Sequence, residues 1–214
     1  MKRSVYSLVL MDEVIKAVDE QAYRLGTSRS NLINQILAER LSCVTPEMRM
    51  RDIFSCVEEF IGGAMQIQQQ RSASLLTMRT ALEYKYRPTI SYKVELERSP
   101  KKYLGTLRVH IRTQSDRLIE LFNTFFVYRV RAESAQLSIM GCDYPEWELT
   151  SGNFTRRLLN SGEVTDEQIG EAIGKYIENL NLSVKTFFTD PRNFGAAAPE
   201  LERRYGQMLE KYIV

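Results

Sequence analysis

Residues 4–45 decide the expected fold of the N-terminal region, and they read SVYSLVLMDEVIKAVDEQAYRLGTSRSNLINQILAERLSCVT. Residues that favour β-structure dominate positions 4–10, and Asp12 and Glu13 follow at once with acidic side chains that suit the positive end of a helix. Apolar residues then recur at helical spacing as far as Gly26, a residue type that readily takes the left-handed conformation just past a helix end. The pattern predicts a strand over 4–10 and a helix over about 12–25.

A second helix is predicted over about 29–42, with Ser28 as its N-cap. A lone strand cannot satisfy its own backbone, and two short helices cannot enclose a core, so this order of elements requires a second copy of the chain. We therefore expect a homodimer, or a higher homo-oligomer, in which two strands pair antiparallel. Its shared core is expected to contain Tyr6, Leu8, Leu10, Val14, Val18, Leu32, Ile33, Ile36 and Leu37.

The order and lengths of these elements, together with the turn Gly26-Thr27-Ser28-Arg29-Ser30, resemble the ribbon-helix-helix family typified by the Arc, MetJ and CopG repressors. The resemblance covers roughly residues 3–43. It implies a transcriptional regulator whose partner is double-stranded DNA, with the paired strands lying in the major groove.

The resemblance also implies two sets of DNA contacts. The outward positions of the strand would face the bases, and in this chain they are Arg3, Val5, Ser7 and Val9. Phosphate would be held by Lys2 and by the start of the second helix, at Thr27, Ser28, Arg29 and Ser30. The two valines depart from the polar residues usual in the family, because they could only pack on thymine methyl groups. Considered alone, Ser28 is better explained as an ordinary helix cap, and only the surrounding pattern favours phosphate binding.

The rest of the chain is expected to form a connector over residues 46–83 and an α+β domain over 84–214. A helical stripe begins after Thr45-Pro46, weakens at Gly62-Gly63 and is predicted to resume through Leu75 and Leu82 as helix. Strict alternation over 89–97 and 104–112 predicts a β-hairpin, about 89–112, with Glu95 opposite Arg108 and Val94 opposite Val109.

Helices are expected from Ser115 onward and over 150–160, 165–188 and 199–214, with a loop around 142–147. The fold class is therefore mainly α with minor β: a ribbon-helix-helix dimerisation module followed by a helical domain that contains a hairpin. Residues 46–214 resemble no family.

Charge is unevenly distributed although the net charge of the 214 residues is only +2. Residues 71–131 are basic and 132–214 acidic, which favours internal pairing over a surface that binds phosphate. The tract Tyr84-Lys85-Tyr86-Arg87 and the hairpin residues Lys93, Arg108, His110 and Arg112 combine types that stack on bases and bind phosphate. This set is interpreted first as a solvated sheet face, and second as a nucleic-acid surface or the seat of an anionic ligand. The aromatic residues Phe122, Phe125, Phe126, Tyr128, Trp147 and Phe154 favour a plain core over a ligand pocket.

Several classes of protein are disfavoured. Three dispersed cysteines and the single His110 predict neither a disulfide framework nor a metal site, and no catalytic motif or cofactor-binding loop is present, so we expect no enzyme and no cofactor. No stretch is apolar enough for a signal peptide or membrane span, which predicts a soluble, cytoplasmic protein. The leading hypothesis is a DNA-binding regulator whose C-terminal domain senses a small molecule, engages a protein effector or builds the oligomer. The alternative is an interaction module, an antitoxin or a scaffold, that uses the N-terminal elements only to dimerise.

Overall fold

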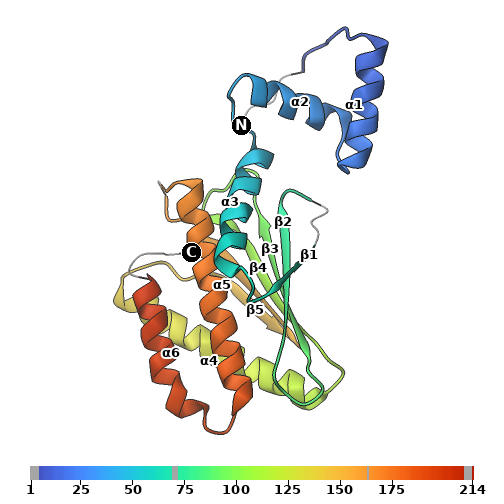
Figure 1. Ribbon diagram of the computed structural model, residues 1–214. Coiled ribbons are helices and arrows are strands. Elements are labelled where there is room, and N and C mark those ends of the chain that lie inside the picture. The colour runs from blue at the N-terminus through green and yellow to red at the C-terminus, as the bar shows by residue number, and fades with distance from the viewer. Residues whose placement is uncertain (1–4, 69–71, 163, 210–213) are drawn as a thin grey trace.

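The computed structural model describes residues 5–68, 72–162, 164–209 and 214. Two helices, α1 (Asp12–Arg24) and α2 (Arg29–Arg40), form a small N-terminal unit that stands apart from a larger body (Figure 1). The larger body has the helices α3 (Pro46–Ile61), α4 (Asp116–Ile139), α5 (Asp166–Thr189) and α6 (Phe194–Leu209). Its strands are β1 (Gln66–Gln68), β2 (Leu75–Ala81), β3 (Thr89–Leu96), β4 (Tyr103–Arg112), β5 (Trp147–Thr150) and β6 (Asn153–Leu159). The α+β class is confirmed, with more β-structure than the expected single hairpin.

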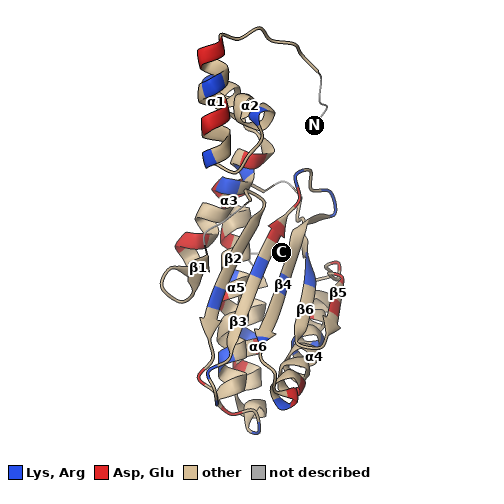
Figure 2. Cartoon of the chain, turned by 90° about the vertical axis from the view of Figure 1, so that its right-hand side faces the viewer, with Lys and Arg blue, Asp and Glu red and all other residues tan. Residues whose placement is uncertain are grey.

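The strands form one sheet in the order β1-β2-β3-β4-β6-β5, and every neighbouring pair is antiparallel. The helices lie against one face of this sheet and leave the other open (Figures 1 and 2). Period-two alternation sends apolar side chains to the covered face, because successive residues of a strand point to opposite sides. The buried set on this face includes Leu76, Met78, Ile90, Tyr92, Val94, Leu107, Val109, Ile111, Phe154 and Leu158.

Helices α3 and α5 pack closely because α5 carries glycine where α3 crosses it. A Cβ added to Gly170 would lie 2.5 Å from Cβ of Cys56 and 2.7 Å from the carbonyl oxygen of Ile53. One turn later, a Cβ on Gly174 would lie 2.8 Å from Cβ of Phe60. Glycine at this four-residue spacing therefore removes the side chains that would hold the helices apart, and it lets α3 bury its apolar face.

We expect Gly170→Ala to destabilise the protein by about 1–3 kcal/mol, because the added methyl would meet backbone and Cβ atoms that cannot move independently. In a solvated helix the same change would stabilise by about 1 kcal/mol through helix propensity, so the sign of the effect is diagnostic. The free energy of unfolding in urea measures it. Gly195→Ala in α6 is the matched control, since a Cβ there meets no atom within 4 Å. Equal stability of the two variants would contradict the close contact.

The helical prediction was wrong for the end of the segment 46–83 and for residues 150–160. Residues 75–81 form β2 and residues 153–159 form β6. In each strand the buried positions alternate, and the backbone is satisfied by ladders to β3 and β4. Tertiary pairing thus overrides a local pattern that is compatible with a helix. The buried residues of α3 and β2 belong to the same core as the C-terminal strands and helices, so this segment does more than connect.

The hairpin is confirmed, but its register is shifted by two residues from the prediction. Lys93 lies opposite Arg108, and Val94 lies opposite Leu107. A shift of two residues keeps every side chain on its predicted face. Arg108 still reaches Glu95, with 3.3 Å between Nη1 and Oε2, as a diagonal rather than a direct pair. Gly105 permits the close approach of the strands, because a Cβ there would lie 2.1 Å from the carbonyl oxygen of Glu95.

The predicted helices and loop after residue 115 are correct in part. Helices α4 and α5 match the expected positions, whereas α6 begins at Phe194, earlier than the expected residue 199. The expected loop around 142–147 is correct as far as residue 146, after which β5 begins at Trp147. Of the aromatic set, Phe122, Phe125, Phe126 and Phe154 are fully buried in the core.

Candidate nucleic-acid interface

The N-terminal unit contains the two helices and the turn that its sequence predicts. The side chain of Ser28 accepts a hydrogen bond of 3.3 Å from the backbone N–H of Asn31, and so caps α2. Gly26 has φ of 61°, the left-handed conformation expected just beyond α1. These two residues fix the turn that carries Thr27, Ser28, Arg29 and Ser30.

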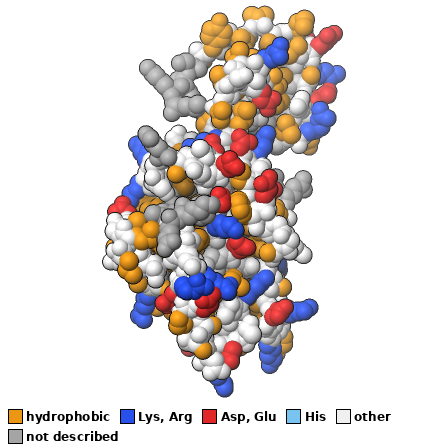
Figure 3. Space-filling model, turned by 60° about the vertical axis from the view of Figure 1, so that its left-hand side comes forward, with side chains coloured by type: hydrophobic (Ala, Val, Ile, Leu, Met, Phe, Trp, Pro, Cys, Tyr) orange, Lys and Arg blue, Asp and Glu red, His pale blue; other side chains and the backbone are white. Residues whose placement is uncertain are grey.

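The core of this unit is very small. Its buried residues are Val18, Ala22 and Leu32, with Ile33 partly buried beside them. The other residues expected in a dimer core remain accessible in the single chain: Tyr6, Leu8, Leu10, Val14, Ile36 and Leu37. Figure 3 shows hydrophobic side chains gathered over this end of the molecule. Two helices alone therefore leave much of the apolar stripe uncovered.

Residues 5–11 precede α1 as an extended segment that forms no strand in the single chain. The strand expected over 4–10 is therefore not formed by the described residues 5–10, because this segment pairs with none of the six strands of the sheet. Val5 and Val9 are fully exposed, and Ser7 is exposed between them. Lys2 and Arg3, expected at the DNA surface, lie outside the described residues.

Arg29 has a partner within the N-terminal unit. Its guanidinium pairs with Asp19 of α1, with 2.5 Å between Nε and Oδ1 and a second contact from Nη2 to Oδ2. Hydrogen bonding to Asp19, together with its charge, raises the pKa of Arg29. Arg29 therefore ties α2 to α1 in the single chain, and any contact with phosphate would compete with Asp19. Ser28 and Ser30 are both exposed and Thr27 is half-buried, and Thr27 and Ser28 line a cavity.

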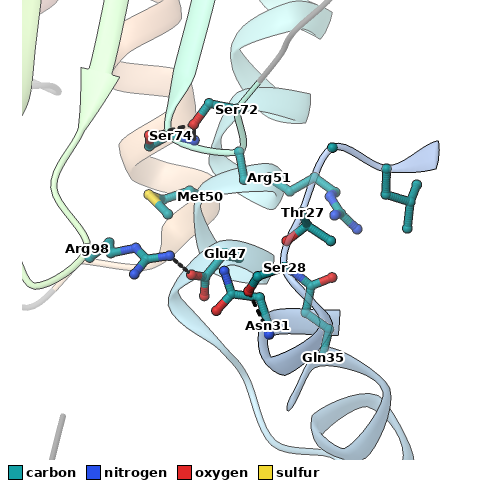
Figure 4. A pocket seen from close by; sticks show the side chains of 13 residues that line it. Thr27, Ser28, Asn31, Gln35, Glu47, Met50, Arg51, Ser72, Ser74 and Arg98 are labelled. Atoms are coloured by element: carbon teal, nitrogen blue, oxygen red, sulfur yellow. Dashed lines mark hydrogen bonds and ion pairs between the residues drawn. The ribbon is translucent and has the colours of Figure 1, made fainter. Parts of the chain in front are cut away.

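This cavity, of about 440 Å³, lies between the N-terminal unit and the larger body (Figure 4). Its polar side chains come from the turn before α2, from α2 and α3, from residues 72–74 and from the segment after β3. Glu47 in the first turn of α3 pairs there with Arg98. Sequence reasoning did not find this cavity, because its lining joins positions that are far apart in the chain. The lining residues are Leu25, Gly26, Thr27, Ser28, Asn31, Gln35, Glu47, Met50, Arg51, Ser72, Ala73, Ser74 and Arg98.

Comparisons of the chain with protein-family models, with curated proteins and with solved structures found no match. In the part of the chain that the structure describes, no cluster of three or more His, Cys, Asp and Glu side chains could hold a metal ion. None of the helices in these residues has the length and apolar character needed to cross a bilayer.

A charged network that sequence reasoning missed lies inside the larger body. Glu133 of α4 accepts hydrogen bonds from Arg129 Nε at 2.6 Å, from Tyr176 Oη at 2.6 Å and from Arg156 Nε at 3.0 Å. All three charged side chains are almost fully buried. Burial alone would raise the pKa of Glu133, but Arg156 and Arg129 together hold it below its ordinary value. The signal available in the sequence was the pair Arg129 and Glu133, because residues four apart lie on the same side of a helix.

The contacts of this network indicate a structural role. Arg156 also donates to the backbone oxygen of Val214 at 2.6 Å, and Arg129 donates to Asn179 at 2.8 Å. The Arg129 guanidinium lies 4.2 Å from the ring centroid of Tyr205, which adds a cation–π contact. A cavity lined by Glu133 and Arg156 measures about 10 Å³, which leaves no room for a ligand there. The network therefore links α4, α5, α6 and β6 rather than presenting a reactive group.

Proposed function

We propose that the chain is a DNA-binding regulator whose N-terminal unit becomes complete only when two copies join. The observation that supports this most directly is the uncovered apolar surface of α1 and α2 beside an extended, unpaired segment. In a dimer, residues 4–10 of one copy would pair with residues 4–10 of the other. Leu37 and its apolar neighbours would be covered by the partner.

The paired segments would form a two-stranded ribbon of a width that the major groove admits. At the start of α2, the first backbone N–H groups have no acceptor within the helix, and the helix dipole favours an anion there. Ser30 is exposed at this position. Arg29 would also reach a phosphate here once its exposed ion pair with Asp19 is broken. Phosphate binding at this end would position the ribbon, and residues 3–9 would supply whatever contacts reach the bases.

Two opposite charge changes test this proposal. Arg29→Gln removes a phosphate-binding cation, whereas Asp19→Asn removes the carboxylate that competes for it. We expect Arg29→Gln to weaken binding of duplex DNA and to make the salt dependence shallower by about 2 in log–log slope, since each lost phosphate contact contributes roughly 0.9 and a dimer loses two. Asp19→Asn should strengthen binding. Fluorescence anisotropy on labelled genomic fragments measures both effects.

The outcome that contradicts this proposal is equally specific. If the wild-type dimer binds every genomic fragment no better than random duplex, sequence-specific regulation is excluded. If Arg29→Gln and Asp19→Asn change DNA affinity in the same direction, phosphate is not held at this helix end. Arg24→Gln, which removes an exposed cation from the last turn of α1, is the control for a general loss of charge.

One observation favours a second function, an interaction module that uses the N-terminal unit only to dimerise. Val5 and Val9, at the expected base-facing positions, cannot donate or accept hydrogen bonds, and both are fully exposed. On this alternative the ribbon would contact an apolar protein surface. Val5→Thr with Val9→Thr would then weaken capture of a stoichiometric protein partner and leave DNA affinity unchanged.

A further inference from the structure

The open face of the sheet contains a hollow that the N-terminal unit does not touch. Its volume is about 280 Å³, and strands β2, β3, β4 and β6 supply its lining. No carboxylate is among the lining residues, which are Arg79, Thr89, Ser91, Lys93, Arg108, His110, Arg112 and Asn153. In Figure 2 the Lys and Arg positions, in blue, lie on neighbouring strands of the sheet.

The strand register explains why these residues meet. Arg79 lies opposite Ser91, Ser91 opposite His110, and His110 opposite Asn153, so one row crosses four adjacent strands. Lys93 and Arg108 lie opposite each other in the next row. Neighbouring strands are about 4.8 Å apart, so long cationic side chains from both rows can reach one small ligand.

The charge of this hollow is only partly balanced. Arg108 pairs with Glu95, and both side chains are more than half exposed. Within residues 5–68, 72–162, 164–209 and 214, Arg79, Lys93 and Arg112 form no ion pair with a carboxylate. Arginines elsewhere on the sheet differ, since Arg157 pairs with Glu97. Cations therefore gather here without an equal number of acidic partners.

Two polar groups that line the hollow are available to a ligand. Ser91 is only 9% exposed, and its hydroxyl has no hydrogen-bond partner among the described residues. His110 Nδ1 lies 3.1 Å from the carbonyl oxygen of Gly152, and because a carbonyl only accepts, Nδ1 is the nitrogen that carries the proton. The other ring nitrogen is left for a different partner. A water molecule could satisfy the Ser91 hydroxyl but could not balance the charge.

We propose that this hollow binds the phosphate group of a small phosphorylated molecule. A phosphate satisfies both unmet requirements at once, since its oxygens accept from Ser91 and from guanidinium groups while its charge balances the unpaired cations. The volume is close to the lower end of small-molecule sites. Single-stranded nucleic acid fits less well, because no Tyr, Phe or Trp lines the hollow to stack on a base. The inference does not depend on the function proposed for the N-terminal unit.

Calorimetric titration of the full-length protein with inorganic pyrophosphate and with AMP tests this site. We expect one pyrophosphate per chain, bound more weakly at high salt. Arg79→Gln should weaken binding roughly tenfold, because it removes a charge-assisted donor. Ser91→Ala should weaken it roughly fivefold with no change of charge, which separates a built site from general attraction of anions. Arg131→Gln, an exposed cation on α4, is the control and should have no effect.

Three results would overturn the proposal: no detectable binding of pyrophosphate or AMP, binding that Ser91→Ala and Arg79→Gln leave unchanged, or an equal loss in Arg131→Gln. Labelled duplex DNA forms a parallel arm. If the sheet variants weaken DNA binding as strongly as Arg29→Gln does, the hollow contacts the DNA backbone and the small-ligand assignment is wrong. Normal DNA binding without pyrophosphate binding would remove this inference and leave the proposed function standing.

Discussion

Replacing Leu37 with glutamate should convert the protein from a dimer into a monomer while the larger body stays folded. In the single chain the Leu37 side chain is 47% exposed, so a glutamate there meets water and costs a monomer less than about 0.5 kcal/mol. In the proposed dimer the same position is covered in both copies. Each dimer would then bury two carboxylates that have no partner, and burying each one costs about 2 kcal/mol or more. The total weakens the dimerisation affinity by roughly 1,000-fold.

Sedimentation velocity at micromolar concentration measures the oligomeric state, and circular dichroism measures whether the helices remain. Ile139→Glu makes the same chemical change at the end of α4, where the apolar side chain is also exposed, and it should leave the dimer intact. A wild-type protein that sediments as a single chain, or a Leu37→Glu variant that still dimerises, would rule out the shared N-terminal core. DNA affinity should fall together with dimerisation, because the ribbon needs two strands.

The second large effect is expected at Glu133, where Glu133→Gln should lower the free energy of unfolding by about 3–5 kcal/mol at neutral pH. The variant leaves the buried guanidinium groups of Arg129 and Arg156 without their carboxylate. Glutamine also offers one acceptor oxygen in place of two, so its NH₂ group would face an arginine donor. Native domains are stable by only about 5–15 kcal/mol, so the change removes a large share of the total.

Urea unfolding measures the loss of stability, and the dependence of this loss on pH identifies the ionised Glu133 as its cause. Because the folded protein holds the pKa of Glu133 below its ordinary value of 4.5, ionised Glu133 stabilises the fold above that pH. The stabilisation fades as the pH falls below 4.5 and through the lowered folded value, so wild type and Glu133→Gln should converge in acid. Glu120→Gln is the control on the same helix, since its pairing with Arg117 is exposed, and it should cost less than about 1 kcal/mol. A Glu133→Gln variant as stable as Glu120→Gln would show that the network is not stabilising.

The sequence predicted the helices whose ends and stripes are set locally. The Ser28 cap marks α2, and α5 begins with a capping box in which Thr165 and Gln168 each bond the backbone of the other. The polar face of the hairpin was also predictable, because alternation alone assigns Lys93, Arg108, His110 and Arg112 to one side.

The rest depended on partners that are distant in the chain. Leu75, Leu76, Met78 and Leu82 fit a helix as well as a strand, and only pairing with β3 decides between them. In β6 the buried Arg156 disguised the alternation, because its charge is matched by Glu133 from α4. Since β2 and β6 were expected to be helical, Arg79 and Asn153 could not be assigned to the hollow of the open sheet. The tract Tyr84-Lys85-Tyr86-Arg87 lies between β2 and β3 and is not part of that hollow.

The two hydrophobic clusters share no residue, so the larger body and the N-terminal unit depend differently on chain concentration. The larger body encloses its own core, so its folding is unimolecular and independent of concentration. If the N-terminal unit is completed by a second copy, that step is bimolecular. When most chains are monomeric, the concentration of the DNA-binding dimer would then rise with the square of the chain concentration. A modest change in expression would therefore produce a larger change in the amount of DNA bound.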